Sequence, residues 1–127
     1  MNKFDVVYCC SDSSYWLEHQ YKEVKKYLNK IKVFHPKVLM DECNENSVII
    51  KRKRFKELQY YIDTNRIKTL FVPSLKVLGN DIRIITNYII FLYRAGVVIK
   101  VANKDERKIV QEIIRTVHVA SNKIKEK

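Results

Sequence analysis

The chain has 127 residues, which suits a single domain large enough to bury a hydrophobic core. It is 46% hydrophobic and 31% charged, with only two glycines and two prolines, and this composition excludes disordered and fibrous classes. Lysine and arginine number 25 against 14 acidic residues, giving a formal net charge of +11. Such an excess favours a polyanionic partner, most often nucleic acid, over a basic surface kept only for solubility.

Membrane, metal and disulfide chemistry find little support in the sequence. Charges break each apolar run well before the roughly 18 residues of a membrane span, and Asp5 interrupts the N-terminal run, which argues against a secretory signal. The cysteines are odd in number, and neighbouring Cys9 and Cys10 would point to opposite faces of a strand. We therefore expect a reducing, cytoplasmic location without disulfides. No cysteine or histidine spacing suits a metal, so no metal or other cofactor is expected.

The first half of the chain predicts two strand–helix units. Residues 4–10 form a short apolar run typical of a strand covered on both faces, and apolar residues then recur at helical spacing from Trp16 to Ile31. Residues 37–40 predict a second strand, and the polar residues 41–47 predict a mobile loop. The segment KRKRFK, residues 51–56, opens a second helix that should end near Asn65.

The second half continues the alternation. Residues 67–72 predict a third strand, and Gly79 precedes a helix that Gly96 ends. Residues 97–101 predict a fourth strand, and a long last helix should run from Asp105. The residues expected on the apolar faces of these two helices are Ile82, Ile85, Tyr88 or Ile89, and Leu92, then Ile109, Val110, Ile113, Ile114, Val117, Ala120 and Ile124.

This alternation predicts an α/β fold, a three-layer α/β/α domain with a mainly parallel central sheet and a long C-terminal helix. In such sheets the working site lies beyond the carboxyl ends of the strands. The turn at Ser11 and the loops at residues 41–50 and 74–80 should therefore meet there. An unrelated nucleotide-binding protein is a weaker alternative, because the chain has no glycine-rich loop.

Four short motifs follow one another along the chain. They are Ser11 with Leu17 and Gln20, Arg52 with Phe55, Leu75 with Leu78 and Gly79 in LFVPSLKVLGN, and RAGVVIKV at residues 94–101. In these spacings the chain resembles the catalytic domain of resolvase/invertase-type serine recombinases, over most of residues 5–103. The resemblance places Ser11 on the family nucleophile. A shift of one residue would instead align Tyr8 with the family tyrosine and put Asp12 on the nucleophile, but it loses Leu17 and Gln20.

The resemblance implies a metal-free attack of the serine hydroxyl on a DNA phosphodiester, forming a phosphoserine link. The family surrounds the phosphate with arginines and one aspartate, and here Cys9, Val77 and Asn80 replace arginines while Lys76 replaces the aspartate. Loss of one preorganised donor typically costs about 10²- to 10³-fold in rate. We therefore expect a weakened recombinase or, alternatively, an inactive homologue that serves as a dimerising DNA-binding or regulatory protein.

Two purely structural interpretations are alternatives to the catalytic one. Taken alone, Asp12, Ser13 or Ser14 would serve as the N-cap of the following helix, and Cys9 is more typical of a small core residue than of a reactive thiol. Within the resemblance, Ser11 and Arg52 are the expected catalytic residues. The residues expected to contact DNA are Lys51, Lys53, Arg54, Lys76 and Arg83.

The charge of KRKRFK opposes the positive end of the helix dipole, so something must compensate it. A DNA phosphate backbone would do so, whereas the alternative is a solvated helix start. The resemblance also divides the chain into a resolvase-like domain at residues 1–103 and a dimerisation helix at residues 104–127, without a helix-turn-helix domain. The expected partners are DNA and a second copy of the chain, as a homodimer or higher oligomer, and no membrane.

Overall fold

The computed structural model describes residues 3–43 and 52–125, with side chains described as far as residue 120. In these residues the core is one sheet of four strands in the order β2-β1-β3-β4, and all three pairings are parallel. In chain order the elements are β1 (Phe4–Ser11), α1 (Ser14–Lys30), β2 (Lys37–Glu42), α2 (Lys53–Asp63), β3 (Ile67–Val72), the 3-10 turn η2 (Leu75–Leu78), α3 (Ile82–Arg94), β4 (Val98–Val101), the 3-10 turn η3 (Lys104–Glu106) and α4 (Arg107–Lys125).

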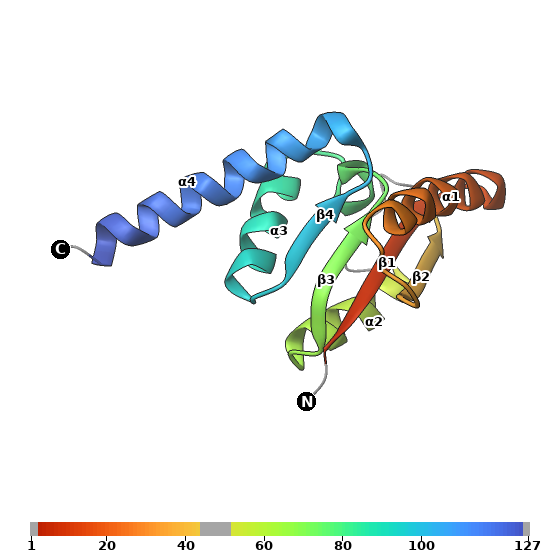
Figure 1. Cartoon of the computed structure of the whole chain (residues 1–127), viewed down its shortest axis with the longest axis horizontal. Coiled ribbons are helices and arrows are strands. Elements are labelled where there is room, and N and C mark those ends of the chain that lie inside the picture. The colour runs from red at the N-terminus through yellow and green to blue at the C-terminus, as the bar shows by residue number, and fades with distance from the viewer. Residues whose placement is uncertain (1–2, 44–51, 126–127) are drawn as a thin grey trace.

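Helices cover both faces of this sheet (Figure 1). On one face α1 packs its buried residues against the odd-numbered residues of β1 and against β3; the set is Leu17, Val24, Leu28, Val7, Cys9 and Phe71. On the other face α2 and α3 bury Phe55, Leu58, Ile62, Ile85, Ile89 and Leu92 against Val6, Tyr8, Cys10 and Leu70. Because strand side chains alternate between faces, β1 is buried on both. The predicted three-layer α/β fold with a parallel sheet is therefore confirmed.

The ends of the helices follow the signals in the sequence. Ser13 is the N-cap of α1, and its hydroxyl accepts a hydrogen bond from the backbone N–H of Trp16 at 3.3 Å. Asp81 caps α3 by accepting from the N–H of Arg83 at 2.7 Å. Asn65 and Gly96 follow α2 and α3 with φ of 58° and 79°, the left-handed conformation that ends a helix.

The structure departs from the sequence prediction at three places. Residues 41 and 42 are the end of β2 and not part of a loop, while residues 44–47 lie outside the described part. Within the predicted loop at 74–80, Leu75–Leu78 form the short 3-10 turn η2, whose leucines are buried. Ile82 is 59% exposed and not on the apolar face of α3.

The C-terminal helix α4 begins after η3 and runs past α3 to Lys125 (Figure 1). Its Val110 joins the core, whereas Ile109 and Val119 are 40% and 45% exposed. The side chain of Glu106, just before α4, accepts the N–H of Leu75 at 3.0 Å and so ties the helix start to η2. No helix within residues 3–43 and 52–125 is both long and apolar enough to cross a membrane.

Candidate active site

Ser11 is the last residue of β1, at the edge of the sheet where the strands end. It pairs with Glu42 of β2, and its carbonyl accepts the N–H of Cys43 at 2.9 Å. On the other side β1 outruns β3, because the last β1–β3 pair joins Val7 to Phe71. Within residues 3–43 and 52–125, the final residues of β1 thus have no strand neighbour on the β3 side, and their backbone groups need other partners there.

Gln20 of α1 supplies those partners. Its side-chain oxygen accepts the N–H of Cys10 at 3.1 Å, and its side-chain nitrogen donates to the carbonyl of Cys10 at 2.9 Å. One amide group therefore replaces the missing strand for the residue that precedes Ser11. The spacing of Ser11 and Gln20 has a physical reason in this chain, since the glutamine holds the end of β1 in place.

Replacing Gln20 with Ala should lower the free energy of unfolding by about 1–2 kcal/mol, because two part-buried backbone groups lose their partner. The N–H of Cys10 should also exchange with solvent faster in native-state hydrogen exchange. The matched control is Gln59→Ala, whose amide bonds only the exposed Asp63 at 3.0 Å and should change stability by less than about 0.5 kcal/mol. Equal losses in the two variants would contradict the role assigned to Gln20.

The alternation of β1 separates the two expected catalytic residues. Ser11 follows Val7 and Cys9 on the face that α1 covers, whereas Tyr8 and Cys10 are on the face of α2 and Arg52. Both Ser11 and Arg52 are only 3% exposed. Arg52 thus lies on the same face as Tyr8, which is the residue that matches the family tyrosine when the alignment is shifted by one residue.

Arg52 is directed into the protein. It is the residue that precedes α2, and its Nη1 donates to the carbonyl of Val77 in η2. Burial opposes its charge, but the hydrogen bond with Tyr8 and the nearby Cys10 hold the pKa of Arg52 above its ordinary value. Arg52 therefore joins η2 to the end of β1, a structural role that the sequence motif did not indicate.

Asp41 is a buried carboxylate beside the candidate site that sequence reasoning missed. Its carboxylate is 6% exposed and accepts three hydrogen bonds, from the hydroxyl of Tyr8 at 2.7 Å and from the N–H groups of Arg54 and Phe55 at 2.8 and 3.0 Å. Burial and this bond to Asp41 raise the pKa of Tyr8. The signal was its position directly after the predicted strand at residues 37–40, since the carboxyl ends of parallel strands bring polar groups together.

Asp41 also caps α2 from a neighbouring strand. A carboxylate on the first N–H groups of a helix compensates its positive end. The charge of KRKRFK therefore has an internal counterpart, and DNA is not required to explain how this helix begins. Whether these cations also contact DNA stays a prediction.

The expected DNA-contacting residues lie on three elements. Lys53 and Arg54 are exposed at the start of α2, and Lys76 is exposed on η2 next to Val77, so they flank Arg52. Arg54 pairs with Glu57 at 3.3 Å, and Arg83 pairs with Asp81 at 3.4 Å at the start of α3. Lys51 lies outside the described residues.

Cys9 is fully buried between β1 and α1, and burial raises its pKa to about 12. Its environment is that of a core residue, because a thiol with so high a pKa is scarcely ionised at neutral pH. Among the described residues, no group of three His, Cys, Asp or Glu side chains could hold a metal ion.

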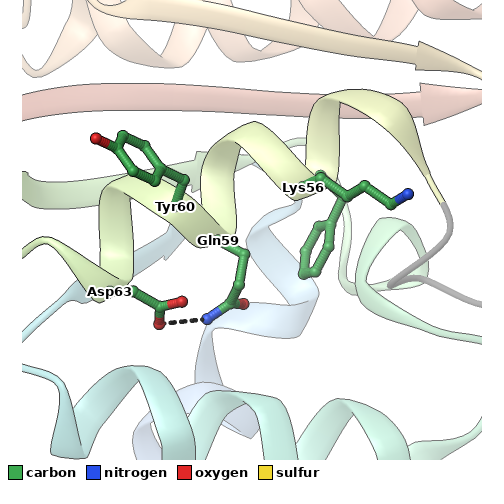
Figure 2. Close-up of a pocket in the computed structure, with 5 residues that line it drawn as sticks. Lys56, Gln59, Tyr60 and Asp63 are labelled. Atoms are coloured by element: carbon green, nitrogen blue, oxygen red, sulfur yellow. Dashed lines mark hydrogen bonds between the residues drawn. The ribbon is translucent and has the colours of Figure 1, made fainter.

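A shallow pocket of about 270 Å³ lies along α2, lined by Phe55, Lys56, Gln59, Tyr60 and Asp63 (Figure 2). Figure 2 shows the amide of Gln59 turned to the carboxylate of Asp63, so the two polar groups already satisfy each other. All five lining residues belong to one helix, and neither Ser11 nor Arg52 is among them. The strand ends, and not this pocket, are therefore the candidate active site.

The sequence matches no protein-family model and no curated protein. Solved structures do match. The N-terminal catalytic domain of TP901-1 integrase has 14% identity and a TM-score of 0.69, with 96% of both chains covered. The C-terminal catalytic domain of ISC1926 TnpA, an IS607-like serine recombinase, has 20% identity and a TM-score of 0.66, over 94% of this chain and 84% of that one.

A resolvase family site-specific recombinase from Streptococcus pneumoniae has 12% identity and a TM-score of 0.63, covering 97% of this chain and 91% of its own. These identities are low, and what the neighbours share with this chain is the arrangement of strands and helices over nearly its whole length. The fold that the sequence motifs predicted is therefore confirmed: the chain has the fold of the catalytic domains of resolvase-type serine recombinases.

Proposed function

We propose that this protein acts on DNA in site-specific recombination, with Ser11 as the nucleophile. The observation that carries the proposal is the position of Ser11 at the end of the central strand, held by Gln20, in a fold shared with serine recombinase catalytic domains. A net charge of +11 supports a polyanionic substrate. Exposed Lys53 and Lys76 near Arg52 supply positive charge at the same edge.

In the proposed reaction the Ser11 hydroxyl attacks a DNA phosphorus. A new O–P bond forms, the bond to one sugar oxygen breaks, and the proton lost by the serine is balanced by the one gained on the leaving hydroxyl. Serine is a weak nucleophile and depends on neighbours that stabilise the developing charge. Lysines carry charge but not the forked donors of arginine, so cleavage should be slow.

The burial of Ser11 and Arg52 favours a second candidate function. Arg52 donates to the carbonyl of Val77, and Ser11 is on the opposite face of β1. A protein arranged in this way would bind DNA and pair with another copy or with an active recombinase without cutting. The exposed Ile109 and Val119 of α4 support such pairing through this helix.

One experiment separates the two functions. The protein is incubated with supercoiled DNA carrying sites from its own genetic neighbourhood, beside an active serine recombinase with its own site, and covalent protein–DNA adducts are measured. We expect an adduct that Ser11→Ala abolishes and that Ser14→Ala, which changes an exposed serine at the start of α1, retains. An adduct lost in Asp12→Ala but kept in Ser11→Ala would show that Asp12 is the nucleophile, as the alignment shifted by one residue implies. DNA binding without any adduct would overturn cleavage and leave the second function.

A further inference from the structure

Two thiols meet across β1 and β2 beside the candidate active site. The Sγ atoms of Cys10 and Cys43 are 3.3 Å apart, and Cys10 Sγ is also 3.7 Å from the carbonyl oxygen of Cys43. Adjacent Cys9 and Cys10 point to opposite faces, as expected, but no local pattern indicates that Cys10 would meet a cysteine that follows another strand. The contact depends on the pairing of β1 with β2.

The register of the two strands produces this contact. Cys10 pairs with Asp41, so Cys43 lies two residues further along on the same face. Tyr8 makes the same diagonal contact one step earlier, since it pairs with Leu39 and bonds to Asp41. The N–H of Cys43 also donates to the carbonyl of Ser11 at 2.9 Å, which fixes its backbone against β1. Sheet geometry therefore brings the two sulfurs together.

We propose that Cys10 and Cys43 are a reversible oxidation site, at which a small-molecule disulfide such as glutathione disulfide produces an intramolecular Cys10–Cys43 bond. In the first step the Cys43 thiolate attacks glutathione disulfide, forming a mixed disulfide and releasing one glutathione. In the second step the Cys10 thiolate attacks Cys43 Sγ and releases the second glutathione. The two protein thiols lose two electrons and two protons, and glutathione disulfide gains them.

Burial decides the order of these steps. Cys43 is partly exposed, whereas Cys10 is fully buried. Burial and the hydrogen bond with Cys43 raise the pKa of Cys10 to about 12, so Cys10 is a poor first attacker at neutral pH. Once Cys43 carries the mixed disulfide, the Cys10 thiol is already next to it. The high effective concentration of Cys10 therefore favours formation of the Cys10–Cys43 bond over persistence of the mixed disulfide.

The bond would join the residue before Ser11 to the residue after β2. To form it, the sulfurs must approach from 3.3 Å to about 2.05 Å. It closes a loop that contains α1 and cross-links the ends of β1 and β2, so it constrains the unfolded chain. The oxidised protein should therefore melt several degrees higher than the reduced protein. This inference does not depend on the proposed recombination.

The test exposes the full chain to glutathione disulfide without denaturant and records the intact mass. Because Cys9 is buried in the folded protein, the remaining thiols are then blocked with iodoacetamide in denaturant, and the products are mapped by mass spectrometry. We expect wild-type protein to lose the mass of two hydrogens, to yield a Cys10–Cys43 linked peptide with Cys9 alkylated, and to revert with dithiothreitol. Cys10→Ala should stop at one glutathione on Cys43. Cys9→Ala, which changes the same strand on its opposite face, should still form the bond.

Three results would overturn the proposal. They are a wild-type protein that accumulates glutathione on Cys43 without closing the bond, a linkage that involves Cys9, and disulfides formed only between two chains. Peptide mapping of wild-type protein gives this answer even if a cysteine variant folds poorly. Unchanged melting of the fully oxidised protein would refute the expected constraint on β1 and β2.

Discussion

Replacing Asp41 with Ala should lower the free energy of unfolding by about 3–5 kcal/mol, a large part of the stability of a small domain. The carboxylate accepts from Tyr8 Oη and from the N–H groups of Arg54 and Phe55, and it is 6% exposed. Its removal leaves a buried hydroxyl and two helix N–H groups without an acceptor, and also uncovers the positive end of α2. Urea unfolding followed by circular dichroism measures the loss.

Asp81→Ala is the matched control for this prediction. Asp81 caps α3 through one backbone N–H, at the protein surface, so its loss should cost about 1 kcal/mol. Asp41→Asn should fall between the two, because the amide keeps an acceptor oxygen but loses the charge. If Asp41→Ala cost no more than Asp81→Ala, the carboxylate would not be the link between β1, β2 and α2.

Much of the fold follows from local patterns. The apolar run of β1, the helical spacing of α1 and the stops at Asn65 and Gly96 each depend on neighbours within a few residues, and each was predicted correctly. Ile82 was placed wrongly, because helical spacing extends an apolar face to the helix end, whereas packing against the sheet ends at Ile85. Only tertiary contacts decide where a face stops being covered.

The site was less predictable because its contacts join distant segments. Asp41 looked like part of a polar loop, since no local pattern shows that Tyr8 and the N-terminus of α2 would converge on it. The motif containing Arg52 could be recognised by spacing alone, but its inward direction depends on Val77, which lies in another element. The spacing of Ser11 and Gln20, by contrast, reflects a contact within one strand–helix unit.

Replacing Arg52 with Ala should destabilise the protein by about 2–4 kcal/mol, because a buried charged donor to a carbonyl is lost together with its packing. Arg52 is 3% exposed, bonds to the carbonyl of Val77 and lies next to Tyr8. Arg52→Lys should recover little of this loss, because one ammonium does not reproduce the forked guanidinium. Thermal and urea unfolding measure the stability. An electrophoretic mobility-shift assay at several salt concentrations, on the same samples, measures the DNA affinity.

Arg54→Ala controls for the loss of one positive charge at the same helix end. Arg54 is exposed and pairs with Glu57, so its removal should change stability by less than about 0.5 kcal/mol. The comparison separates two roles that the sequence motif cannot distinguish. A buried structural arginine affects unfolding first, whereas a phosphate ligand affects DNA affinity and its salt dependence without changing stability. If Arg52→Ala were as stable as Arg54→Ala but bound DNA more weakly, Arg52 would turn outward to phosphate in solution, and the inward contact with Val77 would not be its main role.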